Sequence, residues 1–189
     1  MKPRKAKQSN PAGGNHAQKE PRQLNPKTKK EALRIATGIL SALGYDFSDF
    51  TPDRFANWLE RTRGKKLVFI PFGFSAAKID IFGFWVTDDK RHYICYETDT
   101  PPVHQGFIKT HELMHIVAGH KTLNIGERSI YEFILHLVNN SVTVLPQMRS
   151  FRSTQDDIIA ETMTQLAYEW KKQQTSENVN TYLRSMNFI

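Results

Sequence analysis

The residues best suited to chemistry fall in one pentapeptide, His111-Glu112-Leu113-Met114-His115, which is an HExxH motif. Four residues of α-helix turn through about 400°, so both imidazoles project from one face, one above the other. At that spacing, two ring nitrogens can reach one Zn²⁺ at about 2.0–2.1 Å. Glu112 lies one step around the helix, where it can take a proton from metal-activated water and pass it to a leaving amine. The motif therefore predicts zinc-dependent hydrolysis, with His111 and His115 as ligands and Glu112 as general base.

A third protein ligand is expected from the acidic residues further along the chain. Asp157 and Glu161 are four residues apart, so on a helix they share one face. A pair of carboxylates at this spacing can supply one metal ligand and one acid that orients a histidine. Thr154 and Asp157 also fit a capping box, so a purely structural role remains open. We expect Asp157 as the third ligand, with Glu161 as the alternative ligand or the orienting acid.

Two further histidines lie near the motif. His120 follows His115 by five residues, which departs from the HExxHxxGxxH spacing, in which the third histidine follows by six. We expect His120 to interact with the carboxyl end of its helix, where a cation is favoured. His136 lies on the next predicted helix and is expected to be a core or metal-supporting histidine.

The elements that must position these residues can be read from hydrophobic periodicity. Apolar spacing predicts helices over residues 29–43, 52–63, 103–119, 130–138 and 156–172, and a short terminal helix that includes Tyr182, Leu183 and Met186. Residues 66–72, 79–87 and 92–98 are rich in β-branched and aromatic residues and predict strands, the last two joined as a hairpin. Leu145-Pro146 is expected to interrupt the helical pattern. Because the strands stand together between helices, the order predicts an α+β fold with a small, three-stranded, mostly antiparallel sheet.

Composition narrows the class of protein. The chain of 189 residues is 39% hydrophobic, enough for one core, and it has a single cysteine, which excludes a disulfide framework and a four-cysteine zinc site. It has no apolar run of about 18 residues and no apolar segment behind its charged N-terminus, so we expect a cytoplasmic protein without a membrane anchor.

The net charge of +7 is unevenly placed. Residues 1–30 hold nine Lys or Arg and one acid, Glu20, whereas the remaining 159 residues hold 17 basic and 18 acidic side chains. We therefore expect a disordered basic tail over residues 1–26 and a single domain over residues 27–189. The tail is interpreted either as a weak arm for nucleic acid or an acidic partner, or as a solubilising extension.

Several segments between Ile79 and Leu166 together resemble one known family. Phe82-Gly83-Phe84 resembles a glycine-containing strand, the segment from Phe107 to His115 resembles an HExxH helix, and Asp157-Ile158-Ile159-Ala160-Glu161 resembles a third-ligand helix. In this order, the segments resemble the ImmA/IrrE family of gluzincin-type metallopeptidases. They are also similar in part to the peptidase-like half of ArdC-type antirestriction proteins. Met114 stands where that family usually has glycine, and Asp157 where it usually has glutamate.

The resemblance implies a zincin-like domain that holds one Zn²⁺ per chain. It also implies ligation by His111, His115 and Asp157, with Glu112 as general base. The substrate class implied is a regulatory protein, such as a transcriptional repressor, cut by limited proteolysis. Two alternatives remain at this point. One is a non-catalytic, metal-containing module that sequesters a regulator or contacts nucleic acid through the basic tail, and the other is hydrolysis of a small amide.

Overall fold

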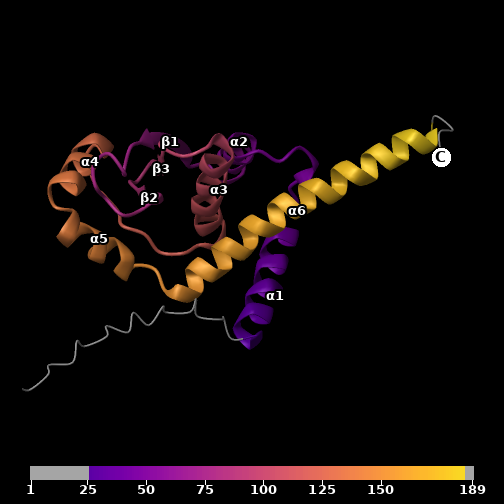
Figure 1. Cartoon of the computed structure of the whole chain (residues 1–189), viewed down its shortest axis with the longest axis horizontal. Coiled ribbons are helices and arrows are strands. Elements are labelled where there is room, and N and C mark those ends of the chain that lie inside the picture. The colour runs from indigo at the N-terminus through magenta and orange to yellow at the C-terminus, as the bar shows by residue number, and fades with distance from the viewer. Residues whose placement is uncertain (1–25, 186–189) are drawn as a thin grey trace, which may run out of the picture.

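The computed structural model describes residues 26–185, which form an α+β fold, as predicted (Figure 1). The elements in this part of the chain are α1 (Pro26–Ala42), η1 (Phe47–Asp49), α2 (Pro52–Arg63), β1 (Lys66–Phe72), β2 (Gly83–Thr87), β3 (Arg91–Glu97), α3 (Pro102–Ala118), α4 (Ile130–Asn139), α5 (Ser141–Ser150) and α6 (Thr154–Ser185). The predicted tail over residues 1–26 lies outside the described residues except for Pro26, where α1 begins. No described helix is long and apolar enough to cross a membrane.

The three strands form one sheet in the order β1-β3-β2. The predicted hairpin is confirmed, because β2 pairs antiparallel with β3 and Trp85 lies opposite Ile94. β1 pairs parallel with β3 along its whole length, from Lys66 opposite Arg91 to Phe72 opposite Glu97. The sheet is therefore mixed, and the expected antiparallel pairing holds for one of its two strand pairs.

β2 is shorter than the predicted strand over residues 79–87. Two backbone N–H groups at its start form local turns, since Ile79 donates to the carbonyl of Phe74 and Ile81 donates to that of Ile79. These groups are consequently not in the ladder, and the strand begins at Gly83.

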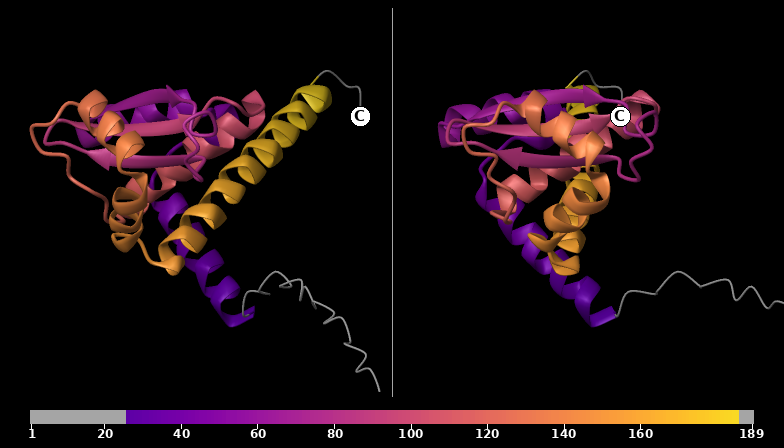
Figure 2. Two further views of the ribbon diagram at one scale, coloured as in Figure 1. Left: turned by 60° about the vertical axis from the view of Figure 1, so that its left-hand side comes forward. Right: turned by 90° about the vertical axis from the view of Figure 1, so that its left-hand side faces the viewer.

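The two faces of the sheet are buried in two hydrophobic clusters. Trp85 and Ile94 face the cluster built with α1, α2, α3 and α6. Phe84 and Cys95 face the opposite cluster, which includes Phe133 of α4 and other apolar residues of α4 and α5. This alternation is the two-residue period of a strand buried on both sides. Figure 2 shows the first part of α6 crossing α1 below the sheet, in agreement with the direct contacts between the two helices.

Two predictions about the helical half are wrong. The segment around Pro146 is helical and belongs to α5, although a break was expected there. Pro146 has no N–H to donate to the carbonyl of Val142. Val142 is 87% exposed, so water can donate to that carbonyl instead. The predicted end near Lys172 and the separate terminal helix are replaced by one continuous helix, α6, which runs to Ser185. No glycine or proline lies within α6 to end it earlier, and Met186 lies outside the described residues.

The N-terminal helices form as predicted. The Thr51 hydroxyl accepts a hydrogen bond from the N–H of Arg54 at the start of α2, and Pro52 follows at the first helical position, where its missing N–H has no cost. Gly64 ends α2 with φ +73°, a conformation that favours glycine. Arg63 at this end donates to the carbonyls of Ile116 and Val117, the last turn of α3. The N-terminal helices thereby hold the carboxyl end of the helix that carries the HExxH motif.

Candidate metal centre

The HExxH motif lies in the second half of α3, as its apolar flanks predict. Leu113 and Met114 are fully buried in the hydrophobic cluster that α3 forms with α1 and α6. His115 is also fully buried, whereas the His111 side chain is 22% exposed. Gly119 then ends the helix with φ +71°.

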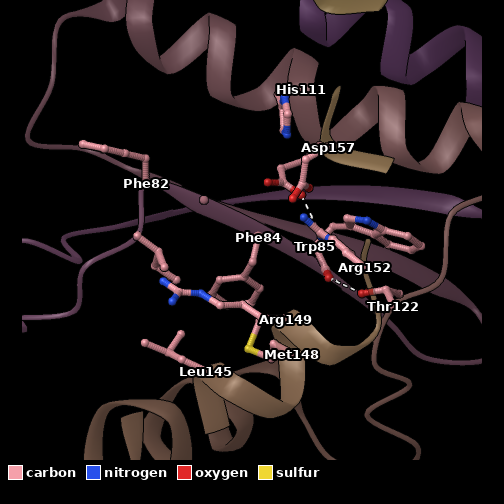
Figure 3. Close-up of a pocket in the computed structure, with 13 residues that line it drawn as sticks. Phe82, Phe84, Trp85, His111, Thr122, Leu145, Met148, Arg149, Arg152 and Asp157 are labelled. Atoms are coloured by element: carbon pink, nitrogen blue, oxygen red, sulfur yellow. Dashed lines mark hydrogen bonds and ion pairs between the residues drawn. The ribbon is translucent and has the colours of Figure 1, made fainter. Parts of the chain in front are cut away.

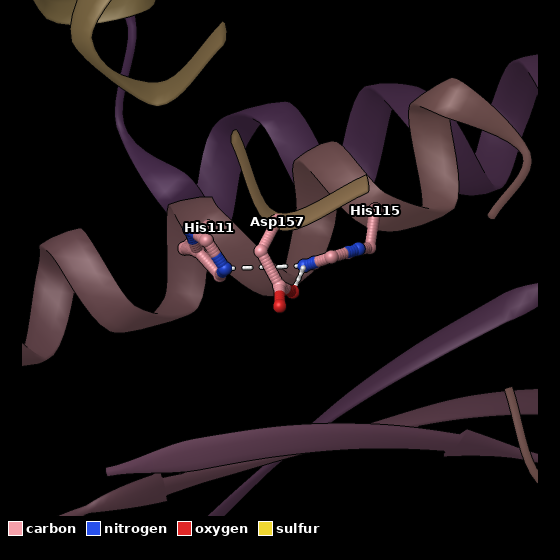
Figure 4. Close-up of side chains that lie close together, drawn as sticks. All are labelled: His111, His115 and Asp157. Atoms are coloured by element: carbon pink, nitrogen blue, oxygen red, sulfur yellow. Dashed lines mark hydrogen bonds and ion pairs between the residues drawn. The ribbon is translucent and has the colours of Figure 1, made fainter. Parts of the chain in front are cut away.

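Three possible ligand atoms meet between α3 and the first turn of α6 (Figure 4). The Nε2 atoms of His111 and His115 lie 3.1 Å apart, and His115 Nε2 lies 3.4 Å from Oδ1 of Asp157. All three donor atoms lie within 4.8 Å of one another. The structure therefore brings together the three residues that the sequence proposes as ligands.

This donor set has the chemistry of a zinc site. Ligand atoms at about 2.05 Å from a tetrahedral ion are separated by about 3.3 Å. Two separations here, 3.1 and 3.4 Å, are close to that value, and the third, between His111 and Asp157, is within 4.8 Å. Two imidazoles and one carboxylate from the protein form a three-ligand set, and the Asp157 side chain is 55% exposed, so the site is open to solvent on the α6 side. Three protein ligands with an open position are typical of catalytic rather than structural zinc sites.

Glu161 lies behind His111. Its Oε2 faces His111 Nδ1 at 3.4 Å, and its other oxygen, Oε1, accepts a hydrogen bond from Gln165. A carboxylate at Nδ1 favours the tautomer with the proton there, which leaves the Nε2 lone pair free for a metal. Of the two roles left open for Glu161, this position corresponds to the orienting acid.

His120 lies behind His115 in the same way. The Nδ1 atoms of the two rings are 2.9 Å apart, and His120 Nε2 faces Oδ1 of Asp156 at 3.5 Å. If His115 donates from Nδ1 to His120, then His120 can donate from Nε2 to Asp156, and the lone pair on His115 Nε2 points at the ligand cluster. His120 was expected to interact with the helix end, and its backbone N–H does donate to the His115 carbonyl. Its side chain also supports a candidate ligand, which the sequence did not predict.

Glu112 lines the same cavity as His111 and Asp157. Its side chain is 5% exposed, and Oε2 accepts a hydrogen bond of 2.9 Å from Nη2 of Arg152, in the connection between α5 and α6. Burial raises the pKa of the Glu112 carboxyl, but the Arg152 guanidinium and the imidazoles of His111 and His115 outweigh burial, so the pKa lies below its usual value. Glu112 is therefore ionised at neutral pH, the state that a general base requires.

The two candidate histidine ligands differ in proton affinity. Burial lowers the pKa of His115, and the Asp157 and Glu112 carboxylates only partly offset this effect. Burial also opposes protonation of His111, but there the Glu161 and Glu112 carboxylates prevail, so the pKa of His111 is raised. A lowered pKa keeps His115 in the neutral form that binds metals.

The cavity beside the motif has a volume of about 280 Å³. Figure 3 shows His111 and Asp157 at one end of it, Leu145 and Met148 of α5 at the other, and Arg152 near Asp157. The N-terminal part of β2 and the residues just before it form a further wall. The candidate ligands His111 and Asp157, the carboxylate of Glu112 and several apolar side chains thus line one cavity.

Gly83 permits this close packing. A Cβ atom at position 83 would lie 2.5 Å from Cγ2 of Ile108 on α3 and 3.1 Å from the carbonyl oxygen of Cys95. The same position is 3.8 Å from Cγ of Glu112. The absence of a side chain at Gly83 therefore lets β2 lie directly against the helix turn that carries Glu112.

The structure differs from the sequence prediction at three other residues, His136, Arg152 and His120. His136 is exposed on α4, where Nδ1 lies 3.2 Å from the amide nitrogen of Asn140, so it is neither a core residue nor near the ligands. Arg152 was missed, and because it is an isolated arginine in a connecting segment, no spacing or periodicity indicates it. His120 had a partial signal, since the sequence places it immediately after the motif helix.

Comparisons of the chain with protein-family models, with curated proteins and with solved structures find no match. The resemblance to the ImmA/IrrE family stays a hypothesis based on the motif residues.

Proposed function

We propose that this protein is a zinc-dependent peptidase that cuts a peptide bond in a regulatory protein. One observation carries the proposal: His111, His115 and Asp157 present three ligand atoms within 4.8 Å, and the ionised Glu112 lies next to them on the cavity wall. A pair of histidines alone could have a purely structural role. A histidine pair with a third ligand, an open side and an adjacent buried carboxylate is what metal-assisted hydrolysis requires.

The residues divide the work between them. His111, His115 and Asp157 would hold the ion, and Glu161 and His120 fix the rings of the two histidines. When bound there, zinc supplies Lewis acidity and makes water a nucleophile near neutral pH. Glu112 accepts the proton of the attacking water and delivers it to the leaving amine. Arg152 keeps Glu112 ionised and holds its carboxylate in place.

The test is metal analysis of purified protein combined with cleavage of a peptide library. We expect about one zinc ion per wild-type chain, and its loss in His111→Ala. Glu112→Gln should keep the metal and reduce cleavage by about 10²- to 10⁴-fold, because the amide cannot take a proton. The exposed His136→Ala is the matched control and should change neither property. Wild-type cleavage by Glu112→Gln would contradict the catalytic role of Glu112.

A second candidate is the non-catalytic, metal-containing binding module. The observation that favours it is the ion pair between Glu112 and Arg152, because a carboxylate held by a guanidinium is a weaker base. The same metal analysis separates the two candidates. A chain that binds one zinc ion, yet cleaves no member of the library with or without Glu112, would be such a module.

A further inference from the structure

We propose that the substrate presents a carboxylate next to a large apolar side chain, and that Arg152 binds this carboxylate inside the cavity beside the metal ligands. The inference rests on the proposed function, since it names the substrate class of that site. It comes from the lining of the cavity, where apolar side chains, Arg149 and Arg152 share one cavity with His111 and Asp157.

Arg152 has hydrogen-bonding capacity that the folded chain does not use. Its side chain is 15% exposed, and within the described residues its one hydrogen bond joins Nη2 to Glu112. A guanidinium carries five N–H donors in a planar fork, and a carboxylate is the ligand that matches this fork in two places. The unused donors of Arg152 can hold a second carboxylate while Nη2 stays on Glu112.

The charge balance of the cavity points the same way. The cations Arg149 and Arg152 are matched by the carboxylates Glu112 and Asp157. Glu161 and Asp156 lie outside this lining, behind the two histidines. A divalent cation on the ligand cluster would therefore give the lining a net positive charge, which favours an anionic group in the substrate. Arg149 contributes to this potential from the last turn of α5, at the exposed side of the cavity.

The remaining wall is apolar. Phe82 and Phe84 contribute from the β2 side, and Leu145 and Met148 contribute from α5. Phe82 is 57% exposed, so part of its ring is accessible to a ligand at this wall. A cavity of about 280 Å³ is at the small end of ligand pockets, so it suits one or two residues of a peptide rather than a long segment.

The carboxylate can come from the C-terminus of a peptide or from an acidic side chain, and three small probes separate these sources. N-acetyl-phenylalanine carries a terminal carboxylate, N-acetyl-aspartyl-phenylalaninamide carries a side-chain carboxylate, and N-acetyl-phenylalaninamide carries none. Binding is measured by calorimetry or NMR titration on the full chain, with the zinc content of each sample determined. All proteins carry Glu112→Gln, which prevents turnover and removes the buried charge that would otherwise be left unpaired when Arg152 is changed.

We expect at least one of the two acids to bind at least tenfold more tightly than the amide probe. Adding Arg152→Gln should reduce this preference to less than twofold, and adding Arg149→Gln should reduce it partially. Arg128→Gln, an exposed arginine away from the cavity, is the matched control and should leave the preference intact. Thermal melting of each variant verifies that it is folded.

Two results would overturn the inference. One is equal binding of all three probes, and the other is a preference for acids that survives Arg152→Gln, because then the metal alone binds the carboxylate. Cleavage is not the readout, so the two proposals fail separately. If the protein binds an acid through Arg152 but cleaves no peptide, the carboxylate site is supported and the peptidase function is contradicted. If it cleaves peptides but shows no preference for acids, the peptidase function is supported and the carboxylate site is contradicted.

Discussion

His115 has both ring nitrogens engaged, one toward the ligand cluster and one toward His120. Most ligating histidines are held by a carbonyl or a carboxylate, and here His120 lies between the candidate ligand His115 and the carboxylate of Asp156. The orientation of His115 therefore depends on a residue just beyond the end of the motif helix. The effect of His120 on the zinc affinity of the candidate site can therefore be measured by substitution.

Replacing His120 by alanine should weaken zinc binding by about 10- to 100-fold, because the His115 ring loses the partner that fixes its tautomer. Competition with a chromogenic chelator measures the affinity. His136→Ala, which removes an exposed histidine from α4, is the control and should bind zinc like the wild type. Unchanged affinity in His120→Ala would show that the contact between His115 and His120 does not support the site.

The sequence predicts the local part of the site and misses the non-local part. His111, Glu112 and His115 follow from helical geometry alone, and Asp157 and Glu161 follow from their shared face on a later helix. The choice between those two acids needs the packing of α6 against α3, which places Asp157 by His115 and Glu161 behind His111. The contact of Arg152 with Glu112 could not be predicted, because Arg152 lies in a connecting segment whose sequence has no periodic pattern.

At the scale of elements, the approach of β2 to α3 is set by the one residue of β2 that has no side chain. Gly83 lies where a Cβ would overlap Ile108, and Ile108 is itself buried. A branched side chain within a packed interface cannot move aside without shifting its helix. The separation of strand and helix, and hence the position of Glu112, therefore depends on Gly83.

Gly83→Ala should lower the free energy of unfolding by about 1–3 kcal/mol, through overpacking against Ile108 and the Cys95 carbonyl. Gly38→Ala is the matched substitution, because a Cβ there meets no atom within 4 Å and the position lies inside α1. It should raise the free energy of unfolding by up to about 1 kcal/mol, as alanine is the better helix former. Urea denaturation of both variants measures the two changes. Equal effects of the same sign would exclude a special role for Gly83.

Elements with strong local signals were predicted well, as α2 illustrates with its Thr51 cap and its end at Gly64. α5 was missed because Pro146 is normally a helix breaker and only its surface position makes the lost hydrogen bond tolerable. The parallel pairing of β1 with β3 was missed for a different reason. It joins two strands with residues 73–90, including β2, between them in the sequence, and the composition of β1 does not indicate whether it runs parallel or antiparallel to β3.

For the molecule as a whole, His92 links stability to pH. It lies on β3 with Nδ1 buried and without a hydrogen-bond partner among the described residues. Burial, together with the charges of Lys65 and Arg63, lowers the pKa of His92 to about 4, and Asp88 opposes this only in part. The folded protein therefore resists protonation of His92 at pH values where the unfolded chain accepts it.

Between about pH 6.5 and pH 4, the unfolded chain binds the His92 proton and the folded chain does not, so stability should fall as the pH falls. With allowance for partial solvent screening, we expect His92 to account for about 1–2 kcal/mol of that loss. Urea denaturation at pH 7, 6, 5 and 4 should show a shallower decline in His92→Gln than in the wild type. Parallel pH profiles for the two proteins would contradict this assignment.

Removing the metal should also lower stability, because the ligands come from two helices and are assembled only in the folded chain. A free zinc concentration of one hundred times the dissociation constant adds about 2.7 kcal/mol. We expect the melting temperature to rise with added zinc and to fall with a chelator, and expect neither response in Asp157→Ala. A wild-type melting temperature indifferent to zinc would argue against the site.

The candidate ligands lie on two helices, α3 and α6. α6 contacts α1, η1 and α3, so an ion shared by α3 and α6 would brace the helical half of the protein from within. Chains made under zinc starvation would open more often and be degraded sooner than well-supplied ones. The abundance of the protein would then follow the availability of zinc, even if its gene is transcribed at a constant rate.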